Sequence, residues 1–181
     1  MENKVGQLEQ LGKLVQPSLE YKASFIEAMR EFQAEGKKLN IDIEDLENNF
    51  NEFLEKIVKD DDLPDDQIPQ TVLWLVDRNE FIGRVSVRQQ LNERLLKEGG
   101  NIGYEIRPSK RKFGYGSKIL ELGLPIAKGL GIHKVLLTCD DDNVGSVRII
   151  EKNGGVLDRE NPKIISPDSG KNVRRYWIEV K

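Results

Sequence analysis

The sequence is poor in the residues on which several kinds of chemistry depend. Its 181 residues include a single cysteine, Cys139, and a single histidine, His133. One cysteine excludes a disulfide framework and a zinc site made of several cysteines. One histidine excludes a histidine-rich metal centre and would leave a Ser–His hydrolase dependent on His133 alone. We therefore expect a protein that binds no metal.

Long apolar runs and an excess of one charge are missing too. No apolar run approaches the roughly 20 residues of a membrane-spanning helix, and the polar residues 1–13 lack a signal-peptide core. The 28 Lys and Arg residues nearly balance the 31 Asp and Glu residues, giving a net charge of -3. This balance excludes nucleic-acid binding by bulk charge. We expect a soluble cytoplasmic protein with neither nucleic acid nor membrane as a partner; a homodimer is left open.

The N-terminal part is predicted to be helical after one short strand at residues 11–15. A helix begins at Ser18, a good N-cap residue, and ends near Gly36, because apolar residues recur between them at helical spacing. A second helix is predicted over residues 43–58. The acidic stretch 60–66 is interpreted either as a solvated loop or as an acidic lip that attracts a cationic substrate.

From residue 71 onward the pattern changes to strands. Three antiparallel strands are predicted, then a helix, a buried strand, a short helix and two last strands, at residues 71–76, 81–90, 101–107, 115–130, 135–139, 145–153, 156–158 and 173–180. Residues 91–100 are expected to be a polar connection and residues 161–170 an irregular loop or hairpin. The fold class is therefore α/β, an α+β arrangement with a mixed, mostly antiparallel sheet of six to seven strands and about four helices.

The stretch from Arg107 to Gly116 is typical of a phosphate-binding loop. A strand ends at Pro108, and basic residues with two spaced glycines lead into a helix. Glycines let the backbone approach an anion closely, and the free N–H groups and dipole of the first helical turn favour negative charge. The basic residues at 110–112 are expected to add positive charge.

Two common phosphate motifs do not fit these residues. A P-loop ends in Gly-Lys-Ser/Thr, whereas Gly116 is followed by Ser117-Lys118. The dinucleotide fingerprint needs Gly or Ala three residues after its second glycine, where Ile119 stands. Residues 111–116 instead match Arg/Gln-x-x-Gly-x-Gly/Ala, the pyrophosphate loop of the GNAT superfamily of N-acetyltransferases.

The residues around this loop also resemble the GNAT superfamily. Ile106-Arg107-Pro108 precedes the loop, and an Asn-x-x-Ser motif at 143–146 follows the buried strand. The chain is most similar to a small subgroup of predicted acetyltransferases with Glu-Lys-Asn-Gly-Gly, here at 151–155. The resemblance implies a single acetyltransferase domain over 1–181. In that domain, 11–66 would form a first strand and a helical acceptor-site segment, and 71–181 the sheet and acetyl-CoA-binding core.

The resemblance further implies where acetyl-CoA lies. The strands at 101–107 and 135–139 are expected to be parallel and splayed, with the pantetheine arm between them. Ile106 would bond the arm through its main chain, Asn143 would bond near it, and Ser146 or Arg148 would reach the adenosine side. The cofactor residues implied in this way are Tyr104, Ile106, Pro108, Arg111, Phe113, Gly114, Tyr115, Gly116, Ser117, Asn143 and Ser146.

The implied reaction is direct attack on the thioester by a primary amine of an unidentified small molecule or peptide. Glu105 is the best candidate for the general base. Strand alternation places it opposite Tyr104 and Ile106, although a strand edge at the cleft could still expose it. Many family members carry a tyrosine as general acid seven residues after the Asn. Ile150 stands at that position, so Tyr176 is the substitute candidate.

The missing tyrosine leaves a second function open, a CoA-binding regulatory module without turnover. In the family the acceptor pocket is built by the N-terminal helices and the last loops, here 18–58 and 158–172. The acidic stretch 60–66, with Glu44, Asp45 and Glu47, is a weak indication of a cationic acceptor.

Overall fold

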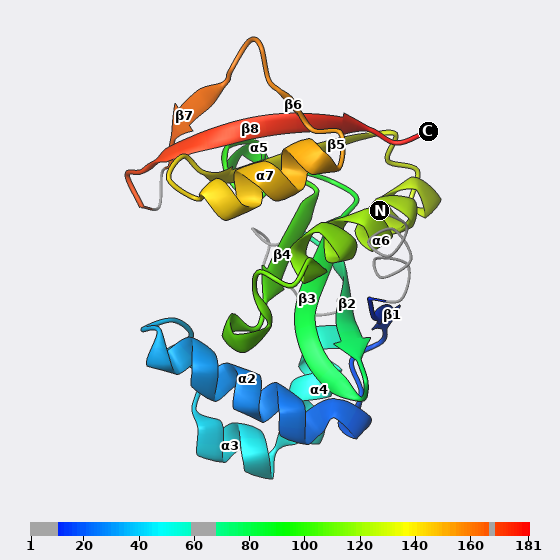
Figure 1. Cartoon of the computed structure of the whole chain (residues 1–181), viewed down its shortest axis with the longest axis vertical. Helices are drawn as coiled ribbons and strands as arrows, with labels where there is room; N and C mark the ends of the chain where they lie inside the picture. Colours follow the sequence, from blue (N-terminus) through cyan, green and yellow to red (C-terminus); the bar gives the residue numbers. More distant parts are fainter. Residues whose placement is uncertain (1–10, 59–67, 167–168) are drawn as a thin grey trace, which may run out of the picture.

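The structure is a computed structural model that describes residues 11–58, 68–166 and 169–181. Its strands form two four-stranded sheets, shown in Figure 1. The first has the order β1-β2-β3-β4, with bounds Lys13–Val15, Gln70–Asp77, Glu80–Arg88 and Ile102–Ile106. In the second sheet, β8 pairs with β5, β6 and β7. Strands β5, β6, β7 and β8 span Lys134–Asp140, Val156–Leu157, Lys163–Ile165 and Asn172–Glu179, respectively.

The helices lie at both ends and along the side of the first sheet. Figure 1 shows α2, α3 and α4 at one end, α6 along the side, and α5 and α7 beside the second sheet at the other end. The α-helices α2 to α7 span Lys22–Ala34, Ile43–Asn48, Phe50–Val58, Glu93–Lys97, Tyr115–Gly129 and Val144–Lys152; two 3₁₀ turns, η1 and η2, span Leu19–Tyr21 and Pro108–Lys110. Among the described residues, none of the helices combines the length and apolar character that a membrane crossing requires.

Local sequence accounts for the central hairpin. Arg78 and Asn79 both have a left-handed backbone, with φ of 48° and 63°. This conformation suits a two-residue turn whose twist matches that of the flanking strands. All pairings within both sheets are antiparallel.

Two apolar cores hold the elements together. One lies between the two sheets and α6 and includes Val85, Ile119 and Leu137, each at most 1% exposed. The other core attaches the three helices α2, α3 and α4 to the first sheet. In it, the ring of Phe25 stacks on that of Trp74 with centroids 4.7 Å apart. The helical N-terminal segment is therefore anchored to β2 and β3 by aromatic packing.

The two sheets are joined where β4 begins. The buried Asn101 donates its backbone N–H to the carbonyl of Leu136 at 2.8 Å, and its side-chain Oδ1 accepts the Leu136 N–H at 2.8 Å. Its Nδ2 donates to the carbonyl of Arg88 at 3.1 Å. Just before it, Gly100 has φ of 62°, and a Cβ there would lie 2.3 Å from the Leu136 oxygen. One asparagine thus closes the junction between β3, β4 and β5.

Several element predictions need correction. The structure has eight strands in two sheets instead of six to seven in one, and six α-helices instead of about four within the described residues. The helix expected at 43–58 is two helices, because Asn49 leaves helical geometry with φ of -117° and ψ of 33°. The connection 91–100 contains α5, capped by the Asn92 side chain, which accepts the Leu95 N–H at 2.9 Å. The acidic stretch 60–66 lies outside the described residues.

Candidate functional site

A pocket of about 560 Å³ lies beside the end of β4. It is bordered by β4, the loop and first turn of α6, the first turn of α7, and the end of α2 with the connection after it. The lining residues are Phe32, Lys37, Tyr104, Glu105, Ile106, Arg111, Lys112, Gly114, Gly116, Ser117, Asn143, Gly145, Ser146 and Ile149.

The loop before α6 and the first turn of this helix hold a row of unused backbone donors, and four of their residues, Lys112, Gly114, Gly116 and Ser117, line this pocket. Among the described residues, no group accepts a hydrogen bond from the backbone N–H of residues 112–117. Lys112 and Gly114 have φ of 67° and 94°, so the chain turns sharply before the helix begins. Gly116 lets α6 approach α7, since a Cβ there would lie 2.5 Å from Cδ1 of Ile149. Such a loop at a helix N-terminus binds an anion by main-chain donors and the helix dipole.

The basic side chains of the loop are mostly engaged elsewhere. Arg107 is buried and pairs with Glu31 at 2.7 Å, Lys110 contacts Glu80, and Arg111 pairs with Glu35 at 2.7 Å. The expectation that the whole basic run faces an anion is therefore only partly correct, because these acids neutralise most of it.

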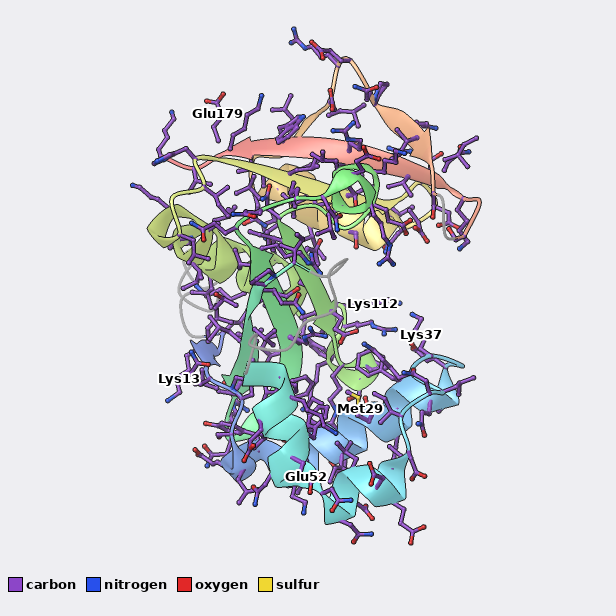
Figure 2. The ribbon with its side chains drawn as sticks, turned by 180° about the vertical axis from the view of Figure 1, so that it is seen from behind. Lys13, Met29, Lys37, Glu52, Lys112 and Glu179 are labelled. Carbon is purple, nitrogen blue, oxygen red and sulfur yellow. The ribbon has the colours of Figure 1, made fainter. Side chains whose placement is uncertain are left out.

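Lys112 is the cation of the run that has no ion-pair partner within the described part of the chain. It lines the pocket together with Lys37. Figure 2 shows these two side chains near each other, one from the loop before α6 and one from the connection after α2. Lys37 lies 3.6 Å from Glu35, so the positive charge that Lys112 brings to the pocket is the less compensated of the two.

Glu105 and Tyr104 border the pocket from opposite faces of β4. Tyr104 and Ile106 pack towards the core with α6, whereas the Glu105 carboxylate accepts from Lys38 Nζ at 3.0 Å on the α2 side. The predicted alternation is thus present, and the pocket reaches around the strand to both faces. The hydroxyl of Tyr104 is shielded and has no hydrogen-bond partner among the described residues. Burial, opposed by the nearby Ser146 side chain, raises the pKa of Tyr104 to about 12.

Tyr176 does not lie at the pocket. It is 1% exposed in the core, and its hydroxyl donates to Glu151 Oε1 at 3.3 Å. Burial also raises its pKa. Because β8 places this ring beneath α7, the position of Tyr176 does not support its predicted role as general acid. Ile150, at the usual tyrosine position, is likewise buried in the core.

The structure brings together eight of the eleven predicted cofactor residues. Pro108, Phe113 and Tyr115 do not line the pocket. Phe113 is 67% exposed, and the Tyr115 hydroxyl donates to Asp77 Oδ2 at 2.5 Å, away from it. Tyr115 can therefore contribute only its main chain.

Lys112, expected to add positive charge, is among the lining residues, whereas Phe32, Lys37, Gly145 and Ile149 line the pocket without having been predicted. Of these four, Gly145 lies inside the recognised Asn-x-x-Ser motif and could have been found there. The loops at 158–172 do not contribute to this pocket in the described residues. Asp45 and Glu47 bond Asn49 and Arg30 instead of lining it.

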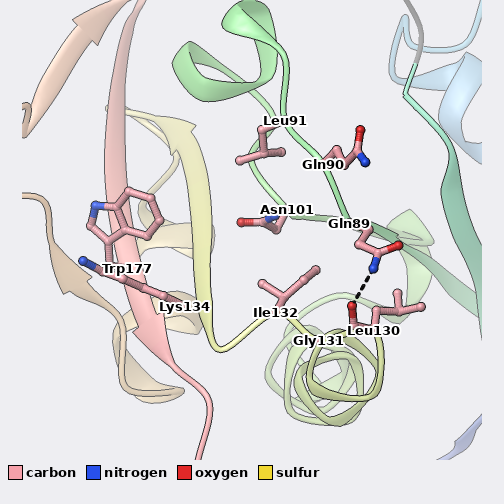
Figure 3. Close-up of a pocket in the computed structure, with 9 residues that line it drawn as sticks. All are labelled: Gln89, Gln90, Leu91, Asn101, Leu130, Gly131, Ile132, Lys134 and Trp177. Carbon is pink, nitrogen blue, oxygen red and sulfur yellow. Dashed lines mark hydrogen bonds between the residues drawn. The ribbon is translucent and has the colours of Figure 1, made fainter.

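A second hollow, of about 630 Å³, opens near the start of β4 and β5 (Figure 3). Its ionisable side chain is Lys134, whose Nζ lies 4.8 Å from the ring centroid of Trp177. Gln89 donates its Nε2 to the Leu130 carbonyl at 2.8 Å. This hollow lacks an acid–base pair. No cluster of three or more His, Cys, Asp or Glu that could hold a metal exists among the described residues.

Comparison with solved structures shows which proteins share this fold. Among solved structures, the chain resembles an acetyl transferase from Salmonella typhimurium that modifies the N-terminal serine of 50S ribosomal subunit protein L7/L12. The two sequences are 15% identical, the match covers 96% of this chain and 98% of the other, and the TM-score is 0.64. It also resembles the microcin C7 self-immunity acetyltransferase MccE in complex with acetyl-CoA and AMP, with 14% identity, 96% and 95% coverage and a TM-score of 0.65.

A third similar structure is yncA from Salmonella typhimurium with acetyl-CoA, with 12% identity, 94% and 95% coverage and a TM-score of 0.58. Among curated proteins, none matches the chain significantly. These structural likenesses show the fold. The family model for the acetyltransferase (GNAT) domain matches residues 21–156, three quarters of the sequence. The chain therefore belongs to the GNAT family of N-acetyltransferases.

Proposed function

We propose that the pocket binds acetyl-CoA and that the chain transfers its acetyl group to a primary amine of a small molecule or peptide. The observation that carries this proposal is the row of unused N–H donors at residues 112–117. Backbone donors at the start of a helix suit a pyrophosphate, and the Lys112 ammonium adds charge at the same place. Two structurally similar proteins were solved with acetyl-CoA.

The pantetheine arm would follow the gap between β4 and β5. These strands are tied at their start by Asn101 and Leu136. Towards the end of β4, the lining side chains Tyr104, Ile106 and Ile149 offer an apolar wall, and Asn143 and Ser146 offer polar groups. We infer that β4 and β5 are the parallel, splayed pair expected from the family resemblance, and that the whole chain acts as a single acetyltransferase domain.

Bound acetyl-CoA supplies the thioester that the amine attacks. As the amide C–N bond forms, the C–S bond would break, and CoA would leave as a thiol carrying a proton released by the amine. An amine must lose its proton to become nucleophilic, and the Glu105 carboxylate is placed to take it from the α2 side of the pocket. Lys38, at 3.0 Å, holds that carboxylate in position. Tyr176 does not enter this proposal, because its hydroxyl is buried against Glu151.

Two measurements test the proposed function. Calorimetric titration of the protein with acetyl-CoA is expected to show saturable binding. Release of free thiol on adding a panel of amino acids, peptides and polyamines is expected to identify an acceptor. Binding without thiol release from any amine would favour a regulatory CoA-binding module, which the family membership does not favour. Absence of binding would contradict both.

Replacement of Glu105 by Gln tests the proposed base. We expect kcat/KM for the amine to fall about 100-fold, because removing a positioned base typically costs that much or more, and the dependence of rate on pH to flatten. Acetyl-CoA affinity should stay unchanged. Glu93→Gln, at an exposed position of α5, is the matched control. An unchanged pH–rate profile in Glu105→Gln would remove Glu105 from the mechanism.

A further inference from the structure

An acidic stripe on α2 faces the loop that precedes the proposed pyrophosphate site. Glu27, Glu31 and Glu35 are spaced by four residues, so they lie along one face of the helix. Each pairs with an arginine of the loop: Arg107 contacts Glu27 and Glu31, and Arg111 contacts Glu35. The stripe and the loop are far apart in the sequence and meet only in the folded protein.

Glu31 makes the densest contacts of the stripe. One carboxylate oxygen, Oε1, accepts from Arg107 Nε at 2.8 Å and from the Ser109 hydroxyl at 2.9 Å, and it lies 2.7 Å from Arg107 Nη2 as an ion pair. The other, Oε2, accepts the backbone N–H of Ser109 at 3.0 Å. Glu27, by comparison, is mostly exposed and makes a single contact at 3.2 Å.

The loop held in this way leads directly into a left-handed turn. Lys112 and Gly114, three and five residues after Ser109, have left-handed conformations. Glycine adopts this conformation readily, but a lysine keeps it only where the surrounding structure holds it. The donors at 112–117 must point together at one anion. Ser109 lies three residues before the first of them, so its position determines where the row of donors begins. A side chain that fixes this start lowers the cost of ordering the loop on binding.

We propose that Glu31 is a positioning residue for the cofactor loop, through which α2 preorganises the acetyl-CoA site. This inference rests on the proposed function. Glu31 touches neither the pocket nor the reacting atoms, so it acts on acetyl-CoA affinity and leaves the chemical step unchanged. The same helix supplies Phe32 to the pocket wall, so its position matters to both sides of the site.

The contacts of Glu31 also predict a dependence on pH. Partial burial raises the pKa of Glu31, but the hydrogen bonds from Arg107 and Ser109 outweigh it, and the net pKa is lowered. At any pH above 4.5, the ordinary pKa of a glutamate, the ionised Glu31 carboxylate therefore holds the loop. It releases the loop as the pH falls through the lowered pKa of Glu31. The carboxylates that also face this cluster are Glu27, which contacts Arg107, and Glu35, which contacts Arg111.

The test is the substitution Glu31→Gln, with Glu47→Gln as the matched control, which removes an ion pair between α3 and Arg30 of α2 away from the loop. We expect Glu31→Gln to raise the Kd and KM for acetyl-CoA about tenfold, while kcat and the KM for the amine change less than twofold. Acetyl-CoA binding by the wild type is expected to weaken as the pH falls below 4.5 through the lowered pKa of Glu31, and the variant should lose the part of this change that comes from Glu31. Glu47→Gln should bind like the wild type.

A lower Tm of Glu31→Gln with unchanged acetyl-CoA affinity would overturn the inference and leave Glu31 a purely structural residue. If this variant does not fold, Ser109→Ala decides, because it removes one exposed donor and should raise the Kd two- to threefold; an unchanged Kd would overturn the inference. A wild type that does not bind acetyl-CoA would instead overturn the proposed function, and this inference with it.

Discussion

Gly116→Leu is expected to abolish measurable acetyl-CoA binding, raising the Kd at least about 100-fold. A Cβ at this position would already lie 2.5 Å from Cδ1 of Ile149 and 3.9 Å from Cγ1 of Ile106. The larger side chain would push α7 from α6 and cover the donors at 112–117. Losing two or more hydrogen bonds to a charged group, about 1.5–3 kcal/mol each, accounts for this magnitude. Calorimetric titration with acetyl-CoA measures it.

The matched control for this substitution lies at the other end of the same helix. Gly129 has no atom within 4 Å of the place where its Cβ would be. Gly129→Ala should therefore bind acetyl-CoA as the wild type does and gain about 0.5–1 kcal/mol of stability, as expected when Ala replaces Gly in a helix. Normal binding by Gly116→Leu would show that the row of N–H donors is not the anion site.

Asn101→Ala is expected to give the largest loss of stability, about 2–5 kcal/mol in the free energy of unfolding. The substitution leaves the N–H of Leu136 unpaired in the interior and removes the amide donor to the partly buried carbonyl of Arg88. Each unsatisfied buried group costs about 1–3 kcal/mol. Because this residue fixes where β4 leaves β5, acetyl-CoA affinity should fall as well. Denaturant unfolding measures the first effect and titration the second.

An exposed asparagine provides the comparison for this experiment. Asn51 lies on the surface of α4, where Ala is at least as favourable for the helix as Asn. Asn51→Ala should therefore change the free energy of unfolding by no more than about 0.5 kcal/mol and leave acetyl-CoA binding unchanged. A loss below about 1 kcal/mol in Asn101→Ala would mean that water replaces the amide at the junction, and the junction would then not depend on this side chain.

Much of the cofactor site could be predicted because its signals are local. Residues 111–116 carry the turn, the glycines and the helix start within one short segment, and the Asn143 cap of α7 lies within four residues of Ser146, whose N–H it accepts at 3.0 Å. Spacing alone is enough for such features, since each depends on neighbours along the chain. The break of the second N-terminal helix at Asn49 had no comparably clear local signal.

Other features depend on residues that are distant in the sequence. Arg107 reads locally as one more cation beside a phosphate loop, yet it is neutralised by Glu31, 76 residues away. The side chain of Tyr176 could face a cleft or the core according to the register of β8, and its pairing with Leu137 places it in the core. Alternation within β8 places Tyr176 on the same face as Ile178, which is also buried, but it does not tell which element covers that face.

The sequence by itself determined the family, the order of most elements and the loop that presents donors at 112–117, because motifs and periodicity are properties of adjacent residues. Only the tertiary structure decided which charges remain available at the pocket, and that Glu105 and Tyr104 share it from two faces of one strand. It also decided that Asn101 joins the two sheets. These depend on packing and on pairing between distant segments, where burial and partner, rather than residue type, decide what a side chain can do.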